Sequence, residues 1–349
     1  MTHLADTAVY LDRINRAQAA MEQAGVDVLL VSVGRDLPYL TGYEAMPLER
    51  LTMLVVPRGG EATLVIPRME APRVVEQPGV FALRAWNETD DPVAIVAALA
   101  GTPTTAAVGD TMWARFVVEL LGHWPSTSTQ YLRSTVVMNE LRTRKDAAEI
   151  AALQAAGAAA DRVADQLHAG LIPLEGRTEA EVSADISARL LVEGHDIVNF
   201  AIVAAGENAA SPHHHPGGRV IRHGEIVLCD FGGTMNGYCS DITRCVHTGE
   251  VPEDIARAYA VLKEAQAAGV AAGRIGASCE TVDAVTRKVI DDAGYGEWFV
   301  HRTGHGIGMD AHEDPYIVEG NRRPLEVGHA YSVEPGIYVE GKWGMRLED

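Results

Sequence analysis

Residues 225–244 have the sequence EIVLCDFGGTMNGYCSDITR, and this stretch predicts a β-hairpin. Its first half is an apolar run typical of a buried strand. Asn236 and Gly237 follow, and this pair favours a two-residue type I′ turn because both residues accept a positive φ. Such a turn places Met235 opposite Tyr238 and sets the register of the whole hairpin.

The predicted register brings two acidic side chains to one face of the hairpin. It places Gly232 opposite Asp241, and Asp230 lies two residues before Gly232. Cross-strand partners share a face, as do residues two apart, so the two acids are diagonal neighbours about 7–8 Å apart at the backbone. Carboxylates this close repel each other unless a proton or a metal ion lies between them. A surface hairpin with two solvated acids is the alternative.

Composition and charge limit the class of protein. The 349 residues are enough for two domains, and no apolar run approaches the roughly 20 residues of a membrane span. The net charge of −19 argues against nucleic acid and anionic membranes as partners, because phosphate groups attract Lys and Arg. Asp6 and Asp12 interrupt the first twenty residues, so we expect no signal peptide. Four cysteines without CxxC spacing fit reduced thiols and a cytoplasmic location.

The first 140 residues alternate between helical and strand patterns. Leu11, Ile14, Ala17 and Met21 recur at helical spacing, and Gly25 ends this helix. Strands are predicted at 27–32, 51–56 and 62–66, and further helices at 69–77, 92–100 and 112–121. The alternation predicts a small α/β domain. This domain contains no nucleophile–base pair and no phosphate-binding glycine motif. We therefore expect it to mediate dimerisation and to line one side of a cleft.

A polar break at 136–146 follows, and we expect domains at 1–142 and 143–349. Asp146 can cap a long helix with Glu149 at its third position. A second capping box, Thr178 with Glu181, starts the next helix. The remaining predicted elements are helices at 253–272 and 280–293, strands at 198–204 and 330–333, a polar loop at 211–216 (SPHHHP) and a glycine-rich stretch at 301–308 (HRTGHGIG).

Five side chains at or beside predicted strand turns could form one metal site: Asp230, Asp241, His305, Glu334 and Glu348. Four carboxylates and one imidazole suit two hard or borderline divalent ions such as Mn²⁺ better than a structural zinc. Two ions would neutralise the acids and activate a water between them. Each residue also has a plainer interpretation. His305 could be only a turn residue, Glu334 a solvated strand end, and Glu348 part of a frayed tail. The histidines at 213–215 could be only a surface loop.

Six motifs in order over about 120 residues resemble the metallopeptidases of the pita-bread fold, particularly the Xaa-Pro peptidases prolidase and aminopeptidase P. The motifs are Asp230-Phe-Gly-Gly, Ser240-Asp241-Ile-Thr-Arg244, Gly304-His305-Gly-Ile-Gly308, His312-Glu313, Glu334-Pro-Gly336 and Arg346-Leu-Glu348. The first segment is similar to the amino-terminal domain of prolidases and creatinase. The resemblance implies an α/β N-terminal domain followed by an α+β pita-bread catalytic domain, and a homodimer.

The resemblance also implies a role for each motif residue. Asp230 would hold one metal, His305 and Glu334 the other, and Asp241 and Glu348 would bridge the two. The ions would be Mn²⁺, with Co²⁺, Zn²⁺ and Fe²⁺ as alternatives, and Glu334 would act as general acid/base on the bridging water.

The remaining implied residues concern the substrate. His213 and His312 would lie near the scissile carbonyl. His301 would line the pocket for the proline ring. Arg346 is also predicted to help bind the substrate, and it would contact the metal ligands rather than the metals. His214 and His215 match no motif and are interpreted as bystanders.

The short first domain favours a dipeptidase that acts on small peptides with proline at the second position. A dipeptidase must bind a free carboxylate, and Arg50 is the candidate. The alternatives are aminopeptidase P, a creatinase-like hydrolase and a non-enzymatic relative; creatinase lacks this ligand set, and methionine aminopeptidase lacks the first domain. Family members usually continue past the last glutamate, so Glu348 is either less firmly held or part of a shortened closure.

Overall fold

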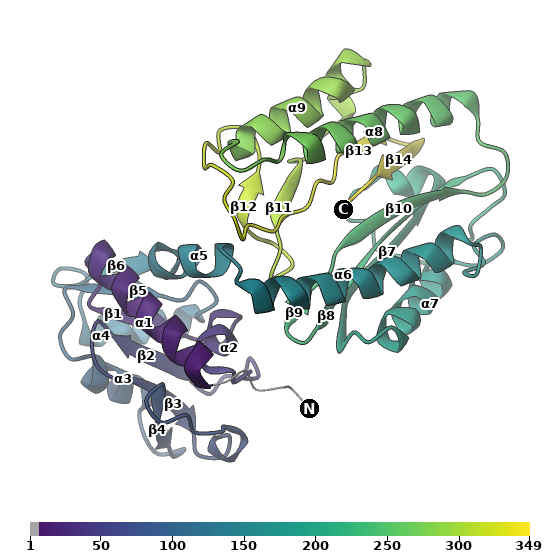
Figure 1. Ribbon diagram of the computed structural model, residues 1–349. Helices are drawn as coiled ribbons and strands as arrows, with labels where there is room; N and C mark the ends of the chain where they lie inside the picture. The colour runs from purple at the N-terminus through teal and green to yellow at the C-terminus, as the bar shows by residue number, and fades with distance from the viewer. Residues whose placement is uncertain (1–6) are drawn as a thin grey trace. The chain divides into compact units, whose positions relative to one another are not determined.

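The computed structural model describes residues 7–349, and the first six residues of the predicted N-terminal domain lie outside this range. The chain divides into two compact units, one ending at Arg142 and the other comprising Thr143–Asp349 (Figure 1). In the described residues, no helix is both long and apolar enough to span a bilayer.

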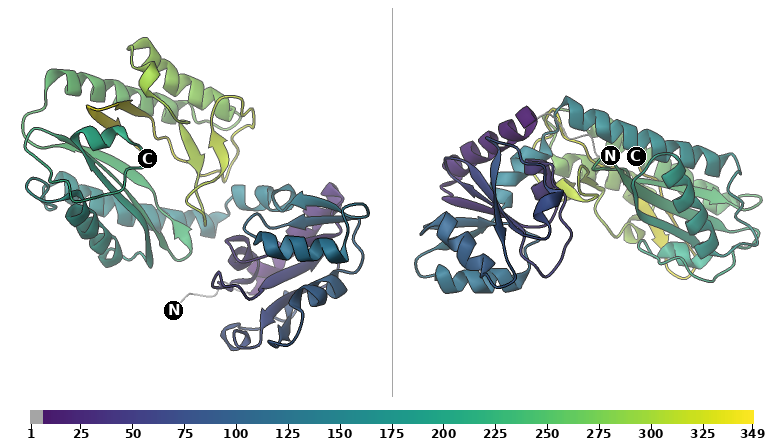
Figure 2. Two further views of the ribbon diagram at one scale, coloured as in Figure 1. Left: turned by 180° about the vertical axis from the view of Figure 1, so that it is seen from behind. Right: turned by 90° about the horizontal axis from the view of Figure 1, so that it is seen from below.

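The first unit is built on a mixed six-stranded sheet in the order β4-β3-β2-β1-β5-β6. Its strands are β1 (Val28–Val31), β2 (Met53–Pro57), β3 (Ala62–Pro67), β4 (Phe81–Trp86), β5 (Thr105–Val108) and β6 (Gln130–Arg133). Its helices are α1 (Thr7–Ala24), α2 (Asp36–Thr41), α3 (Pro92–Ala100), α4 (Ala114–His123) and α5 (Thr135–Thr143). All residues of β1 are buried, as expected for a strand with both faces covered, and helices flank the sheet on both sides (Figure 2).

Most elements predicted for this unit are confirmed, with two exceptions. The pattern at 69–77 is not a helix; it contains only a short 3₁₀ turn, Ala71–Arg73. Proline at position 72 lacks an amide donor, and Met69 and Val75 are exposed, so this segment has no buried stripe to stabilise a helix. The predicted break at 136–142 is instead the helix α5.

The second unit combines a curved sheet with four helices and two further strand pairs. The sheet has the order β10-β8-β7, with β9 paired to β8. The strands are β7 (Ile197–Ala205), β8 (Ile226–Met235), β9 (Tyr238–Cys239), β10 (Ile242–His247), β11 (Gly304–Gly306), β12 (Glu313–Ile317), β13 (Gly336–Val339) and β14 (Trp343–Arg346). The helices are α6 (Ala147–His168), α7 (Glu179–Val192), α8 (Glu253–Ala272) and α9 (Cys279–Asp292).

The two larger apolar cores of this unit each join helices to strands. The first joins α6 and α7 to β7 and β8, and both predicted capping boxes are present at the starts of these helices. The second core joins α8 and α9 to the β13–β14 pair, which lies beside α8 in Figure 1. Helices α8 and α9 thus support the strand pairs, with α8 against β13 and β14 and α9 against β12.

The predicted hairpin is confirmed in turn and register. Met235 pairs with Tyr238, and the turn residues Asn236 and Gly237 have φ of 51° and 83°. The same register continues at Phe231↔Ile242, which places Gly232 opposite Asp241. A side chain at position 232 would overlap the carbonyl of Ser240, so the strands approach this closely only because the residue is glycine.

The prediction of a strand at 330–333 is wrong, because these residues do not form a regular strand. This segment runs beside β11 but forms a single bridge, between Tyr331 and Gly306. The amide of His305 donates to the Ser332 hydroxyl at 3.1 Å rather than to a carbonyl, which interrupts the ladder. The same hydroxyl donates to Glu334 at 3.3 Å, so the irregularity ties two of the predicted metal ligands together.

Candidate metal centre

The second unit brings together all five residues that the sequence predicts as metal ligands. They come from β8, from the β9–β10 connection, from β11, and from the segments before β13 and after β14. Three overlapping groups have ligand atoms within 4.8 Å of one another: Asp230, Asp241 and Glu348; His305, Glu334 and Glu348; and Asp241, His305 and His312. Four carboxylates and two imidazoles therefore share one volume.

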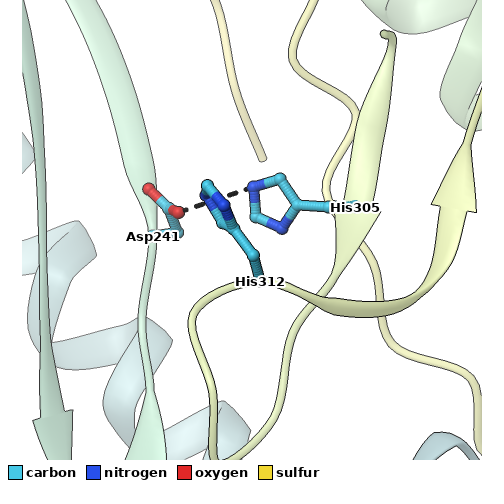
Figure 3. A group of neighbouring side chains, drawn as sticks. All are labelled: Asp241, His305 and His312. Carbon is cyan, nitrogen blue, oxygen red and sulfur yellow. Dashed lines mark ion pairs between the residues drawn. The ribbon is translucent and has the colours of Figure 1, made fainter. Parts of the chain in front are cut away.

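The imidazole of His305 is oriented for this cluster. Its Nδ1 lies 3.1 Å from the carbonyl of Gly306, which leaves Nε2 directed at the acids. Nε2 lies 3.2 Å from Glu334 Oε1 and 3.8 Å from Asp241 Oδ2. Figure 3 shows Asp241, His305 and His312 converging, and the His305 and His312 ring centroids are 3.9 Å apart. His312, predicted near the scissile carbonyl, thus contacts a predicted ligand.

The cluster carries more negative charge than its protein neighbours balance. Burial, together with the neighbouring carboxylates, raises the pKa of Asp241 and of Glu348 well above the usual range. Burial also raises the pKa of Asp230, although Arg346 opposes this. Arg346 is buried and donates through Nη2 to Asp230 Oδ2. One guanidinium does not offset four carboxylates, so the donor set fits added cations.

Two orphaned oxygen atoms provide an independent test of that fit. Asp230 Oδ1 and Glu348 Oε1 are buried and have no hydrogen-bond partner in the part of the chain that the structure describes. Buried polar atoms are nearly always hydrogen-bonded, and an exception calls for a ligand or an ion. Glu348 is only 1% exposed, and its Oε2 accepts from Thr243 Oγ1 at 2.7 Å. Both the frayed-tail interpretation and the expectation of a less firmly held Glu348 are therefore wrong, and oxygen ligation of divalent cations suits the cluster.

Glu334 differs from the other acids. Burial alone would raise its pKa, but hydrogen bonding to His305 and the nearby positive charges lower it below the usual value. The low pKa keeps Glu334 ionised beside His305. An ionised carboxylate at the edge of the cluster can accept a proton.

A hydrogen-bonded chain runs from the cluster to His301. Arg346 Nη1 donates to the Tyr338 hydroxyl at 2.8 Å, which lies 2.9 Å from His301 Nε2. The second His301 nitrogen, Nδ1, lies 2.7 Å from the carbonyl of Arg302. Burial lowers the pKa of His301, which keeps the ring neutral. Both ring nitrogens are engaged, so the ring presents its apolar faces.

Sequence reasoning missed Tyr338, Thr243 and Ser332. The one signal for Tyr338 is Gly336, where a side chain would overlap the Tyr338 ring. In the sequence this glycine is part of the Glu334-Pro-Gly336 motif, and in the structure it also makes room for the tyrosine ring.

The predicted substrate residues lie in different places. His213 is exposed. Burial lowers the pKa of His312 to about 4, with smaller contributions from His305, Arg302 and His213, so His213 lies near His312. Arg50 belongs to the first unit, where it pairs with Glu49 at 2.6 Å and Glu88 at 2.8 Å.

Arg302 is a basic side chain near the cluster that sequence reasoning passed over. Its guanidinium lies 4.4 Å from the centroid of the Tyr316 ring. Among residues 7–349, no acidic side chain forms an ion pair with it.

A two-unit chain with an acidic, imidazole-containing cluster at the ends of its strands fits the class of metal-dependent hydrolases. The comparisons agree. Residues 151–349 match the model of "Metallopeptidase family M24", and residues 13–164 match "Creatinase/Prolidase N-terminal domain". The chain belongs to metallopeptidase family M24, and the predicted fold of an α/β N-terminal domain followed by a pita-bread catalytic domain is confirmed.

Three relatives illustrate the similarity. "Probable dipeptidase PepE" of Mycobacterium tuberculosis is 45% identical over 99% of this chain and 92% of its own length. "Xaa-Pro dipeptidase" of Lactobacillus helveticus is 32% identical over 96% of this chain and 92% of its own length. The crystal structure of dipeptidase PepE from Mycobacterium ulcerans matches with a TM-score of 0.93 and 44% identity, covering 99% of this chain and 93% of that one.

Proposed function

We propose that this protein hydrolyses the Xaa-Pro bond of dipeptides with the help of two divalent metal ions, and that residues 143–349 form the catalytic domain. The observation that carries the proposal is the cluster itself: its residues form three overlapping groups of three, and the ligand atoms of each group lie within 4.8 Å of one another. Two of the buried oxygens also have no hydrogen-bond partner among residues 7–349. The names of two relatives, a dipeptidase and an Xaa-Pro dipeptidase, support the substrate class.

In this proposal Asp230 would hold one ion, His305 and Glu334 would hold the other, and Asp241 and Glu348 would contribute ligands to both. The ions are Mn²⁺, with Co²⁺, Zn²⁺ and Fe²⁺ as alternatives. When bound, they supply Lewis-acid polarisation of the carbonyl and a water that ionises near neutral pH.

The protein's own groups complete the reaction. Glu334, ionised beside His305, accepts the proton of the attacking water and returns it to the proline nitrogen, which carries no proton of its own in an imide bond. His213 and His312 lie near each other and donate hydrogen bonds to the carbonyl oxygen as its charge develops. His301, with both nitrogens engaged, offers an apolar ring face to the proline ring.

The free carboxylate of a dipeptide needs a cationic partner, and the chain offers two arginines. Arg50 is the partner predicted from the sequence, but it is ion-paired with Glu49 and Glu88. Arg302 lies near His312 in the second unit and has no acidic partner among the described residues. Loss of the true partner raises the KM for Ala-Pro and leaves kcat less affected, so Arg50→Ala and Arg302→Ala measured side by side decide between them.

The first test compares Ala-Pro, Ala-Pro-Ala and Ala-Ala as substrates of metal-stripped protein, with and without Mn²⁺. Mn²⁺-dependent cleavage of Ala-Pro alone supports the dipeptidase. Faster cleavage of Ala-Pro-Ala moves the assignment to an aminopeptidase for longer peptides. Two bound ions without Xaa-Pro cleavage point to another hydrolase of this family, such as a creatinase-like enzyme, and absence of metal binding refutes the proposed centre.

A further inference from the structure

The backbone around His213 is fixed on both sides, although the His213 side chain is exposed. On one side, Arg346 Nη1 donates to the carbonyl oxygen of Pro212 at 3.4 Å. On the other side, His214 Nε2 donates to the Glu179 carboxylate at 2.8 Å. Arg346 is also the residue that holds Asp230, so one of the two anchors belongs to the candidate metal centre itself.

The second anchor is a fully buried carboxylate. Glu179 is the first residue of α7 and has 0% exposure. Besides His214, it accepts hydrogen bonds from Ala205 N at 2.9 Å, from Asn208 Nδ2 at 3.0 Å and from Gly217 N at 3.4 Å. These donors lie before and after position 213 in the chain, so this one carboxylate anchors both ends of the 205–217 loop.

Among the described residues, His214 is the only basic side chain that contacts the Glu179 carboxylate. Removing an ionised carboxylate from water costs several kcal/mol of free energy unless its oxygens accept hydrogen bonds from other groups. The loop therefore supplies His214 and several amide donors to satisfy Glu179, and it cannot shift without breaking these bonds. Within residues 7–349, the side chain of the exposed neighbour His215 forms no hydrogen bond and no ion pair.

We propose that Glu179 and His214 are a positioning pair that holds His213 in place at the reaction centre; this inference rests on the role of His213 in the proposed function. His214 does not reach the substrate in this scheme. It acts through its neighbour, because a displacement of about 1 Å at a group that contacts the reacting atoms can cost about a hundredfold in rate. The histidine interpreted as a bystander from the sequence thus has a specific task.

The matched variants are His214→Ala, His214→Gln and His215→Ala, each assayed with Ala-Pro on Mn²⁺-loaded protein. We expect His214→Ala to lower kcat about 10- to 100-fold. His214→Gln should recover most of the activity, because its amide can still donate to Glu179. His215→Ala should stay within about twofold of wild type, since surface changes away from such contacts have small effects. Unchanged kcat in His214→Ala overturns the proposal.

A double-mutant cycle with His213→Ala separates positioning from general destabilisation. If His214 acts through His213, His213→Ala/His214→Ala is no slower than His213→Ala alone. If the two losses multiply, His214 acts by another route and the proposal fails. It also fails if His213→Ala is as active as wild type, and in that case cleavage of Ala-Pro by wild type still stands.

Hydrogen exchange of the 205–217 amides tests the anchor without any substrate. Exchange should be faster in His214→Ala than in His215→Ala, particularly at Ala205 and Gly217, whose amides donate to Glu179. Equal exchange in the two variants overturns the anchor. Because this readout needs no turnover, a failed anchor is distinguished from a failed assignment of Xaa-Pro hydrolysis.

Discussion

Glu348 combines two properties that predict opposite effects of one substitution. Its Oε1 is buried and has no hydrogen-bond partner among the described residues, and burial among acids raises its pKa. Glu348→Gln removes a repulsive charge from the metal-free protein but also removes a ligand. We therefore expect the melting temperature of metal-free Glu348→Gln to equal or exceed that of metal-free wild type, whereas the rise on adding Mn²⁺ is largely lost. Thermal unfolding with and without Mn²⁺ measures both, and a full Mn²⁺-induced rise in the variant would refute the ligand role.

Tyr338 is important because its hydroxyl connects Arg346 to His301. Tyr338→Phe leaves a buried guanidinium short of one acceptor, so we expect the free energy of unfolding to fall by about 1–3 kcal/mol. Arg346 would also hold Asp230 less firmly, and the affinity for the first Mn²⁺ should fall by about 10-fold or more. Urea unfolding and a metal titration measure the two effects. Tyr295→Phe is the control and should change neither, because the ring is half-buried and its hydroxyl forms no hydrogen bond within the described residues.

The hairpin of β8, β9 and β10 was predictable because its determinants are local. Asn236-Gly237 selects the turn, and the turn alone sets the register that brings Asp230 and Asp241 to one face. The prediction of a strand at 330–333 was wrong for the opposite reason. Its pairing is decided by the hydroxyl of Ser332, which contacts a residue 27 positions away and leaves no trace in a local pattern.

The close approach of β8 to the chain beyond the turn gives a prediction at the level of this element. Gly232→Ala would place a Cβ against the carbonyl of Ser240, which is backbone and cannot move aside easily, so we expect a loss of about 2–3 kcal/mol in the free energy of unfolding. Gly157 lies inside α6 with open space around it. Gly157→Ala should stabilise the protein by up to about 1 kcal/mol. Urea unfolding compares the pair, and equal effects of the two substitutions would contradict the packing argument.

For the molecule as a whole, the sequence predicted which residues gather in the acidic cluster but not the contacts that support them. Carboxylates and imidazoles beside glycines and turns are visible as motifs, and the structure gathers all five predicted residues. The bond from Arg346 to Asp230 joins residues 116 positions apart, and the bond from His214 to Glu179 joins residues 35 apart. Such pairings depend on the completed fold, so spacing and periodicity in a single sequence do not reveal them.

The separation into two units gives the last prediction. All proposed metal ligands lie within 143–349, and the first unit contributes none. A ligand that binds only the native state stabilises what it binds, by about 2.7 kcal/mol at a concentration a hundred times the dissociation constant. We therefore expect Mn²⁺ to slow hydrogen exchange in α6, β8 and β10 and to leave β1, β2 and β5 unchanged. Exchange measured on chelator-treated and Mn²⁺-loaded protein tests this, with Ca²⁺ as the control ion because it prefers more oxygen ligands than this mixed cluster offers. Equal slowing in both units would show that the ions act on the whole chain rather than through this cluster.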